Sequence, residues 1–156
     1  MMEELPFEKK NKQAIIFIGI QASGKTTFYN RLLSGESYTH ISLDVLHTRN
    51  KERLALMDCL ERGKSFVIDN TNPEIADRVP YIQKAKDYGY QVIGLFFQSI
   101  VKHCVNRNNA RRCGVPSDAI AHTSNRLQIP SYLEGFDELY FVRIDNNGFK
   151  VTRWEE

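Results

Sequence analysis

The chain has few cysteines and no long apolar run. Its 156 residues include only Cys59, Cys104 and Cys113, and no two of them have Cys-x-x-Cys spacing. An odd number without that spacing argues against a disulfide framework and against a zinc site, so we expect reduced thiols. The sequence also lacks a stretch long enough to cross a membrane and the apolar segment of a signal peptide. We therefore expect a cytoplasmic protein that makes no membrane contact.

An excess of charge of one sign is also lacking. The 21 lysines and arginines nearly balance the 19 aspartates and glutamates, which leaves a formal charge of +2. A nearly neutral protein does not attract a polyanion through its overall field, so any contact with nucleic acid must be local. The length and the hydrophobic content of 42% suit a single compact domain, and we expect residues 1–156 to form it.

Short apolar runs alternate with helical patterns along the chain. Strands are expected at residues 14–20, 38–42, 65–69 and 91–97. Single helices are expected at residues 24–33, 44–62 and 116–127, with a further helical stretch after Pro73. Strands that alternate with helices predict an α/β fold in which helices cover both faces of a mostly parallel sheet. Residues 138–154, with Asn146-Asn147-Gly148 at their centre, predict a C-terminal β-hairpin.

Residues 19–26 match the pattern G-x-x-x-x-G-K-[ST] between a predicted strand and a predicted helix. Glycines allow backbone N–H groups to converge on phosphate oxygens, and the helix N-terminus adds positive charge. Lys25 supplies a cation for the outer phosphates of ATP, and the Thr26 hydroxyl supplies a ligand for Mg²⁺. A glycine turn beside a surface lysine is the alternative, but motif and context agree on a P-loop NTPase or kinase fold. The predicted ATP-binding residues of the loop are Gly19, Gln21, Ala22, Ser23, Gly24, Lys25, Thr26 and Thr27.

A second acidic ligand for the metal is expected at the end of a neighbouring buried strand. Asp69 directly follows the apolar residues 66–68, as a Walker-B aspartate would. The alternative is a turn or helix-capping residue, because Asp and Asn often form local hydrogen bonds in segments such as 69–73. We favour the interpretation in which Thr26 and Asp69 together hold Mg²⁺.

Asp44 follows another predicted strand and begins the predicted helix 44–62. The carboxyl edge of a parallel sheet is where ligands bind in open α/β folds, so this carboxylate is a candidate general base for a hydroxyl acceptor. Asp is also a frequent helix N-cap, and the two roles can coexist.

Arginines gather after the fourth predicted strand, at positions 107, 111 and 112, and no acidic residue lies between Lys102 and Arg112. A charged run is usually a solvated helix face. Arginines on a segment that folds over ATP can instead neutralise charge on the transferred phosphoryl group. We favour the second interpretation and expect residues 105–128 to form a lid.

These features together resemble the kinase domain of polynucleotide 5′-hydroxyl kinases, within the ATP-dependent P-loop kinases. The resemblance spans most of the chain. It is carried by the P-loop, Ser42-Leu43-Asp44, Asp69-Asn70-Thr71-Asn72-Pro73 followed by Arg78, the stretch 107–116 and residues 130–136. It implies transfer of the ATP γ-phosphoryl group to a polynucleotide 5′-hydroxyl. It also implies that Asp44 is the general base, that Arg111 meets the transferred phosphate, and that Arg107 and Arg112 serve ATP.

The chain departs from that family's pattern beside Asp44. Leu43 and His47 occupy positions that are often basic, although Arg49 lies close by. No D-x-D-x-T string of a phosphatase partner domain occurs, so we expect the kinase half alone, with separate end-healing or ligase proteins as partners. Two alternatives stay open. One is a P-loop kinase of a small-molecule hydroxyl, such as a metabolite, nucleoside or antibiotic, and the other is a nucleotide-dependent ATPase or binding module.

Overall fold

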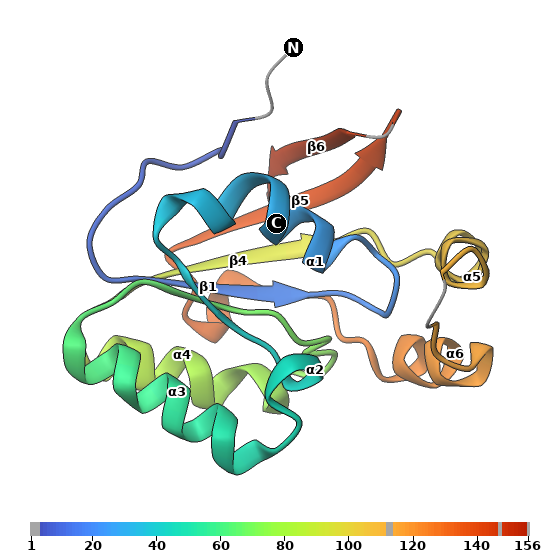
Figure 1. The fold of residues 1–156 in the computed structure, drawn as a ribbon. Coiled ribbons are helices and arrows are strands. Elements are labelled where there is room, and N and C mark those ends of the chain that lie inside the picture. The colour runs from blue at the N-terminus through green and yellow to red at the C-terminus, as the bar shows by residue number, and fades with distance from the viewer. Residues whose placement is uncertain (1–3, 112–113, 147, 156) are drawn as a thin grey trace.

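The computed structural model describes residues 4–111, 114–146 and 148–155. One six-stranded sheet has the order β2-β3-β1-β4-β5-β6. Five strands are parallel, namely β1 (Gln13–Ile18), β2 (Thr39–Ile41), β3 (Phe66–Ile68), β4 (Gln91–Phe97) and β5 (Glu138–Asp145). The last strand, β6 (Gly148–Arg153), runs antiparallel to β5. The predicted mostly parallel sheet and C-terminal hairpin are confirmed (Figure 1).

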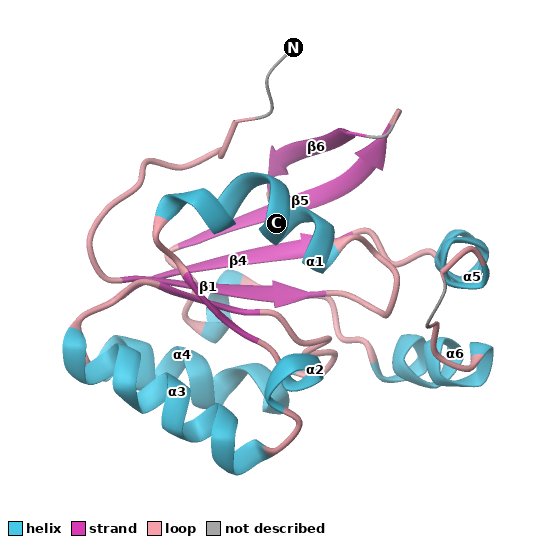
Figure 2. Ribbon diagram, viewed as in Figure 1, coloured by secondary structure: helices cyan, strands magenta, loops and turns pink. Residues whose placement is uncertain are grey.

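Helices lie on both faces of this sheet, with α1 (Lys25–Phe28) on one face and α3 (Arg49–Arg62) and α4 (Ile75–Asp87) on the other (Figure 2). The short α2 (Leu43–Leu46) precedes α3, and α5 (Val101–Asn109) and α6 (Ser117–Arg126) form a lobe beyond the carboxyl ends of the strands. Shorter helical segments are the π-helical η1 (Tyr29–Leu33) and the 3₁₀-helical η2 (Ser34–Glu36) and η3 (Tyr132–Glu134). The segment predicted as a helix at residues 24–33 is therefore helical, with α1 continuing into η1.

Both faces of the central strand β1 are buried, because successive side chains of a strand point to opposite sides. Ile16 and Ile18 pack with Leu56 and Leu60 of α3 and with Ile82 of α4. The alternate residues Ile15 and Phe17 pack with Phe28, Tyr29 and Leu33 of α1 and η1. Burial on both sides explains why this strand is a continuous apolar run, and it places the end of β1 between two helical layers.

The prediction of one long helix over residues 44–62 is wrong. The chain forms α2, turns at His47, whose φ is +68°, and begins α3 at Arg49. The Thr48 hydroxyl accepts a hydrogen bond from the Lys51 backbone N–H at 3.1 Å and so caps α3. Apolar spacing continues across this break, which is why periodicity alone missed it. The break leaves Asp44 on a separate four-residue helix at the sheet edge.

Cys59 and Cys104 are buried and free, whereas Cys113 lies outside the described residues. Across the part of the chain that the structure describes, none of the helices combines the length and apolar character needed to cross a bilayer. Within the same residues, no three His, Cys, Asp or Glu side chains are grouped as metal ligands.

Candidate active site

The loop between β1 and α1 depends on glycine at two positions. A Cβ atom at Gly19 would lie 2.7 Å from the Ser23 hydroxyl oxygen and 3.0 Å from Phe97 Cβ, so a side chain there would crowd the loop. Gly24 has a φ of +102°, which side chains rarely tolerate, and a Cβ there would lie 3.1 Å from the Phe149 ring. The loop therefore wraps tightly before it enters the N-terminus of α1.

Lys25 points back into this loop and is buried. Its ammonium group donates hydrogen bonds to the carbonyl oxygens of Gly19 and Ile20, both at 2.9 Å. Burial lowers the pKa of Lys25 from its ordinary value to about 8, and the carboxylate of Asp69 opposes this shift. Since burial penalises the charged form, a phosphate beside this ammonium group would relieve an unfavourable electrostatic situation.

Thr26 and Asp69 meet as the motif predicts. The Thr26 hydroxyl donates to Asp69 Oδ2 at 2.8 Å, and His40 Nε2 also lies 2.8 Å from that oxygen. His40 stacks on the ring of Tyr29, with centroids 4.2 Å apart. Hard oxygen donors in this arrangement fit a Mg²⁺ ion that keeps several waters. Sequence analysis missed His40 because it lies on a three-residue strand without any motif.

The segment from Asp69 to Pro73 ties the P-loop to the adjoining sheet edge. Thr71 accepts a backbone hydrogen bond from Gly19 at 3.0 Å, and the Asn72 side chain donates to the Phe17 carbonyl at 2.7 Å. Asp69 does not cap a helix, because the N-cap of α4 is Glu74. The alternative capping role for Asp69 is therefore wrong.

Asp44 is exposed in the first turn of α2. The N-cap of this helix is Ser42, whose hydroxyl accepts the backbone N–H of Asp44 at 3.2 Å. The alternative in which Asp44 caps a long helix is therefore also wrong. The carboxylate is close enough to Lys25 to contribute to its electrostatic environment.

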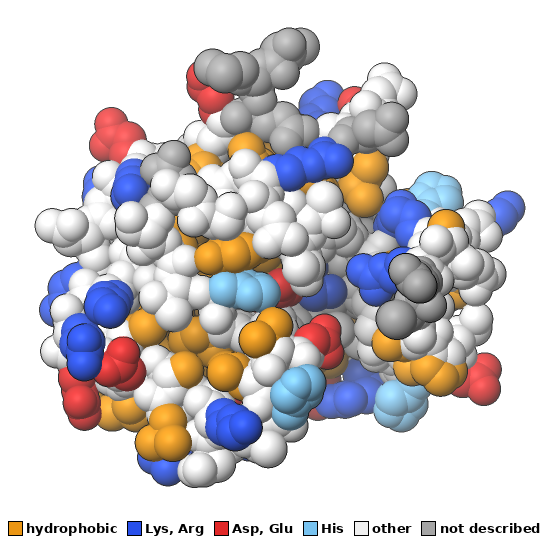
Figure 3. Space-filling view, in the orientation of Figure 1, with side chains coloured by type: hydrophobic (Ala, Val, Ile, Leu, Met, Phe, Trp, Pro, Cys, Tyr) orange, Lys and Arg blue, Asp and Glu red, His pale blue; other side chains and the backbone are white. Residues whose placement is uncertain are grey.

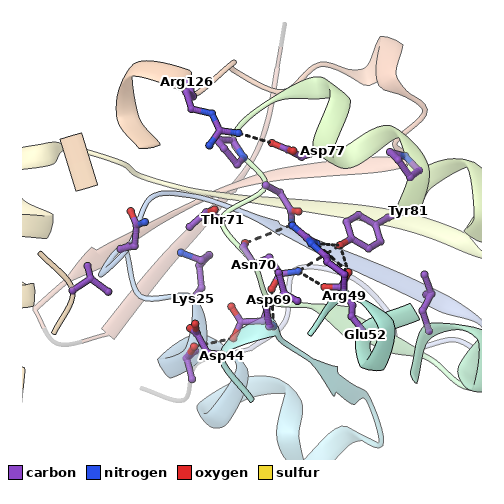
Figure 4. A pocket seen from close by; sticks show the side chains of 18 of the residues that line it. Lys25, Asp44, Arg49, Glu52, Asp69, Asn70, Thr71, Asp77, Tyr81 and Arg126 are labelled. Carbon is purple, nitrogen blue, oxygen red and sulfur yellow. Dashed lines mark hydrogen bonds and ion pairs between the residues drawn. The ribbon is translucent and has the colours of Figure 1, made fainter. Parts of the chain in front are cut away.

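A cleft of about 640 Å³ opens beside the P-loop and brings the main candidates together. The predicted site residues that line it are Gln21, Ala22, Gly24, Lys25, Thr26, Asp44, Asp69 and Arg111. Figure 4 shows Lys25, Asp44 and Asp69 near one end, with Arg49, Glu52 and Tyr81 along the wall. In the space-filling view, both acidic and basic side chains border the hollow between α2 and the lobe of α5 and α6 (Figure 3).

A smaller cavity of about 240 Å³ lies on the other side of the loop. Thr27, Arg107 and Arg111 line it together with Ala22, Gly24 and the aromatic residue Phe149. The Arg107 guanidinium donates to the Ala22 carbonyl at 2.7 Å, so α5 is attached directly to the P-loop. Gly19 and Ser23 are not among the described residues that line either cavity, and Arg112 lies outside the described residues.

The site contains four further polar residues that sequence analysis did not group together. Arg49 and Glu52 come from α3, Asn70 follows β3, and Tyr81 lies on α4. Their side chains form one hydrogen-bonded cluster at the wall of the large cleft. No local pattern joins these residues, because their contacts span up to 32 positions of the chain.

The order of the parallel strands and the glycine-rich loop after β1 define a P-loop kinase fold. The chain belongs to the AAA domain family, whose match covers residues 15–130. A gluconokinase structure from Sinorhizobium meliloti shares this fold with a TM-score of 0.62 and 18% identity, over 86% of this chain and 84% of that one.

Two curated relatives bear out the resemblance to polynucleotide kinases. A protein of Schizosaccharomyces pombe named bifunctional polynucleotide phosphatase/kinase is 28% identical over 135 residues, which cover 83% of this chain and 33% of the relative. A protein of Acanthamoeba polyphaga mimivirus, whose name contains the same words, is 32% identical over 159 residues, with coverages of 96% and 38%. The chain thus spans about a third of the length of these relatives.

Proposed function

We propose that this protein transfers the γ-phosphoryl group of ATP to the 5′-hydroxyl of a nucleic-acid end. The observation that carries the proposal is the large cleft, in which a P-loop lysine, a hydroxyl–carboxylate pair and a separate exposed carboxylate face one space. Lys25, Thr26 and Asp69 suit a nucleotide phosphate with its metal ion. Asp44 is not needed to bind either of them. A further carboxylate beside the phosphates can accept the proton of an acceptor hydroxyl during phosphoryl transfer.

ATP binds on the P-loop side in this proposal. Residues 19–27 surround the phosphates, and the protonated Lys25 contacts the outer ones. The smaller cavity, which Arg107 and Phe149 line, receives the nucleoside part of ATP because it opens beside the same loop. Thr26 and Asp69 would hold Mg²⁺, which neutralises phosphate charge when bound.

The acceptor binds on the side of Asp44. Its carboxylate accepts the proton as the hydroxyl oxygen forms a bond to the γ-phosphorus, and the bond from that phosphorus to the β-phosphate oxygen breaks to release ADP. Arg111 neutralises the charge that the phosphoryl group carries during transfer, which an adjacent cation favours. Residues 105–128 act as the lid, and the bond from Gln21 to Thr123 at 3.0 Å supports this because it joins α6 to the P-loop.

A nucleic-acid acceptor is supported by the names of the two curated relatives, which contain polynucleotide kinase. The size of the cleft also agrees, because about 640 Å³ exceeds what the reacting hydroxyl and a phosphoryl group need. We further propose that residues 1–156 form one kinase domain, and that end-healing or ligase proteins are its partners.

The test is a transfer assay with γ-labelled ATP and Mg²⁺. Oligonucleotides with a 5′-hydroxyl, of DNA and of RNA, are compared with a panel of small alcohols, nucleosides and sugars. We expect label on the oligonucleotides and little on the panel. Transfer only to small alcohols would replace the proposed acceptor, and ATP hydrolysis without any transfer would indicate an ATPase or binding module instead.

A further inference from the structure

Two donors hold the Asp69 carboxylate at one of its oxygens. Asp69 is only 4% exposed, and its Oδ2 lies 2.8 Å from the Thr26 hydroxyl and 2.8 Å from His40 Nε2. An ionised carboxylate only accepts hydrogen bonds, so His40 carries a proton on Nε2 and donates it. Among the residues that the structure describes, no hydrogen bond to Asp69 Oδ1 is found. One oxygen is therefore fixed, and the other is left for a ligand in the cleft that Asp69 lines.

An aromatic stack fixes the ring of His40. The ring lies on that of Tyr29, with centroids 4.2 Å apart and an angle of 22° between the planes. The buried Tyr29 hydroxyl donates to the Tyr38 carbonyl at 2.7 Å, and Tyr38 directly precedes β2, the strand that carries His40. A ring that is both stacked and hydrogen-bonded has little freedom to turn, so Nε2 stays directed at Asp69.

Paired strands hold the backbones of His40 and Asp69 together. Strands β2 and β3 are parallel, with His40 beside Val67, and the backbone N–H of Asp69 donates to the Ile41 carbonyl at 2.8 Å. The contact between the two side chains is thus built on the sheet and not on a loop. A site on such a rigid element keeps its geometry when ligands come and go.

His40 is not among the described residues that line either cavity. It therefore contacts neither ATP nor an acceptor in the proposed function, and its effect on transfer must pass through Asp69. The alternative is a histidine that only stacks at the edge of the sheet and stabilises the fold. That role needs the ring but not the N–H donor, so the two interpretations can be separated.

We propose that His40 is a positioning residue for the metal site, whose Nε2–H holds Asp69 Oδ2 and leaves Oδ1 available to Mg²⁺ or its waters. The proposal rests on the proposed function, in which Thr26 and Asp69 hold Mg²⁺, and deepens it by naming the residue that orients the acid. Mg²⁺ demands nearly ideal octahedral geometry, so a carboxylate that cannot rotate suits it. Loss of such an outer partner typically costs about 10–100-fold in metal affinity.

The test measures the gain in ADP affinity on addition of Mg²⁺. Isothermal titration calorimetry gives the Kd of ADP in EDTA and in Mg²⁺, and the ratio of the two values requires neither an acceptor nor transfer. His40→Phe keeps a ring against Tyr29 and removes the N–H donor. We expect this variant to lower the ratio roughly tenfold. Its Kd for ADP in EDTA should stay unchanged, because the P-loop is not altered.

Two further variants separate the donor from the ring. His40→Gln has no ring, but its amide nitrogen can reach the place of Nε2, so we expect it to keep most of the wild-type ratio. His40→Asn has a shorter amide that does not reach Asp69, and it should behave like His40→Phe. A stacking role alone predicts the reverse order, with His40→Phe near wild type and His40→Gln impaired.

Transfer kinetics provide the second measurement. In His40→Phe we expect the Mg²⁺ concentration for half-maximal transfer to rise roughly tenfold and saturating Mg²⁺ to restore kcat, which would not repair a purely structural defect. His103→Phe is the control, because His103 is an exposed histidine of α5 outside the described lining of both cavities. Melting temperatures of all variants are measured on the same preparations.

An unchanged ratio in His40→Phe would overturn the positioning role and leave the proposed function intact. A wild-type protein in which Mg²⁺ does not change the Kd of ADP would overturn it as well. Failure of the wild type to label oligonucleotides would overturn the proposed acceptor alone, because ADP binding is measured without one.

Discussion

On the proposed donor side of the cleft one continuous loop provides most of the phosphate site and Asp69 joins it, whereas on the proposed acceptor side four separate segments must meet. Residues 19–27 carry the P-loop, its lysine and its hydroxyl. The acceptor wall instead takes side chains from α2, α3, the end of β3 and α4. If the proposed function holds, donor binding is mostly a local property of the chain, while acceptor binding depends on how the helices are held together.

The sharpest way to test the donor side is to remove its charge or its hydroxyl. We expect Lys25→Ala and Thr26→Ala each to abolish measurable phosphoryl transfer, because one removes the phosphate cation and the other a metal ligand. The measurement is transfer from labelled ATP, with thermal unfolding to show that the fold survives. Lys51→Ala, an exposed lysine of α3, is the control. Wild-type turnover in Lys25→Ala or Thr26→Ala would contradict the P-loop assignment.

On the acceptor side, Asp44→Asn tests the proposed base. We expect transfer to fall by about 10²–10⁴-fold because the amide cannot accept the proton. ATP affinity and melting temperature should stay near wild type, since Ser42 and not Asp44 caps α2. Asp58→Asn, which changes an exposed acid of α3, should be nearly neutral. Retained transfer in Asp44→Asn would refute the base and move the acceptor site elsewhere.

The next prediction concerns Arg78, which lies behind the cleft. We expect its role to be in stability and not in catalysis. Arg78 is fully buried and donates to Glu134 Oε1 at 2.7 Å and to the Asn72 carbonyl at 3.0 Å. Arg78→Ala leaves Glu134 charged and buried, so we expect a loss of about 3–5 kcal/mol in the free energy of unfolding.

The matched control for Arg78 is the exposed pair between Lys86 and Asp137, at 2.6 Å. Lys86→Ala should lower the free energy of unfolding by no more than about 1 kcal/mol. Urea unfolding of the two variants measures both losses in the free energy of unfolding. Equal losses in Arg78→Ala and Lys86→Ala would show that the buried pair does not hold the segment after β3.

Arg111 lines both cavities, so it lies where the proposed donor and acceptor sides meet. We expect Arg111→Ala to lower kcat by about 10²-fold, as for a donor that meets charge mainly in the transition state. Its melting temperature should hardly change, because the side chain is exposed. Lys102→Ala, on α5 and outside the described lining of either cavity, serves as the control. Full activity in Arg111→Ala would place the lid contact on another arginine.

The smallest expected effect concerns the break between α2 and α3. Thr48→Ala removes the hydroxyl that caps α3 and should cost about 1 kcal/mol of stability, whereas Thr48→Ser should cost less. Transfer should fall only slightly, because the Asn70 side chain still accepts the backbone N–H of Leu43 and holds α2. Thermal and urea unfolding measure the first effect, and a large loss of transfer in Thr48→Ala would show that the cap also positions Asp44.

Local regularities of the sequence determined much of the fold. The buried runs became β1, β3 and β4 because apolar period and strand length are short-range features, and Asn146 with Gly148 marked the turn of the hairpin. The P-loop could also be recognised from the sequence, because its glycines and Lys25 lie within eight consecutive residues. The roles of Lys25, Asp44, Asp69 and the arginines in ATP and metal binding remain predictions.

Only the tertiary structure decided the acceptor wall. Asp44 came to lie on its own short helix because His47 turns the chain and Thr48 caps the next helix, which apolar spacing could not reveal. At the proposed metal site His40 likewise reaches Asp69 across 29 positions, and at the acceptor wall Tyr81 reaches Glu52 across the same number. Such pairs depend on which strands and helices become neighbours, and a buried polar contact carries no periodic signal in the chain. The P-loop, Asp69 and Asp44 could therefore be named as candidates from the sequence, whereas His40 and the polar cluster around Glu52 required the folded protein.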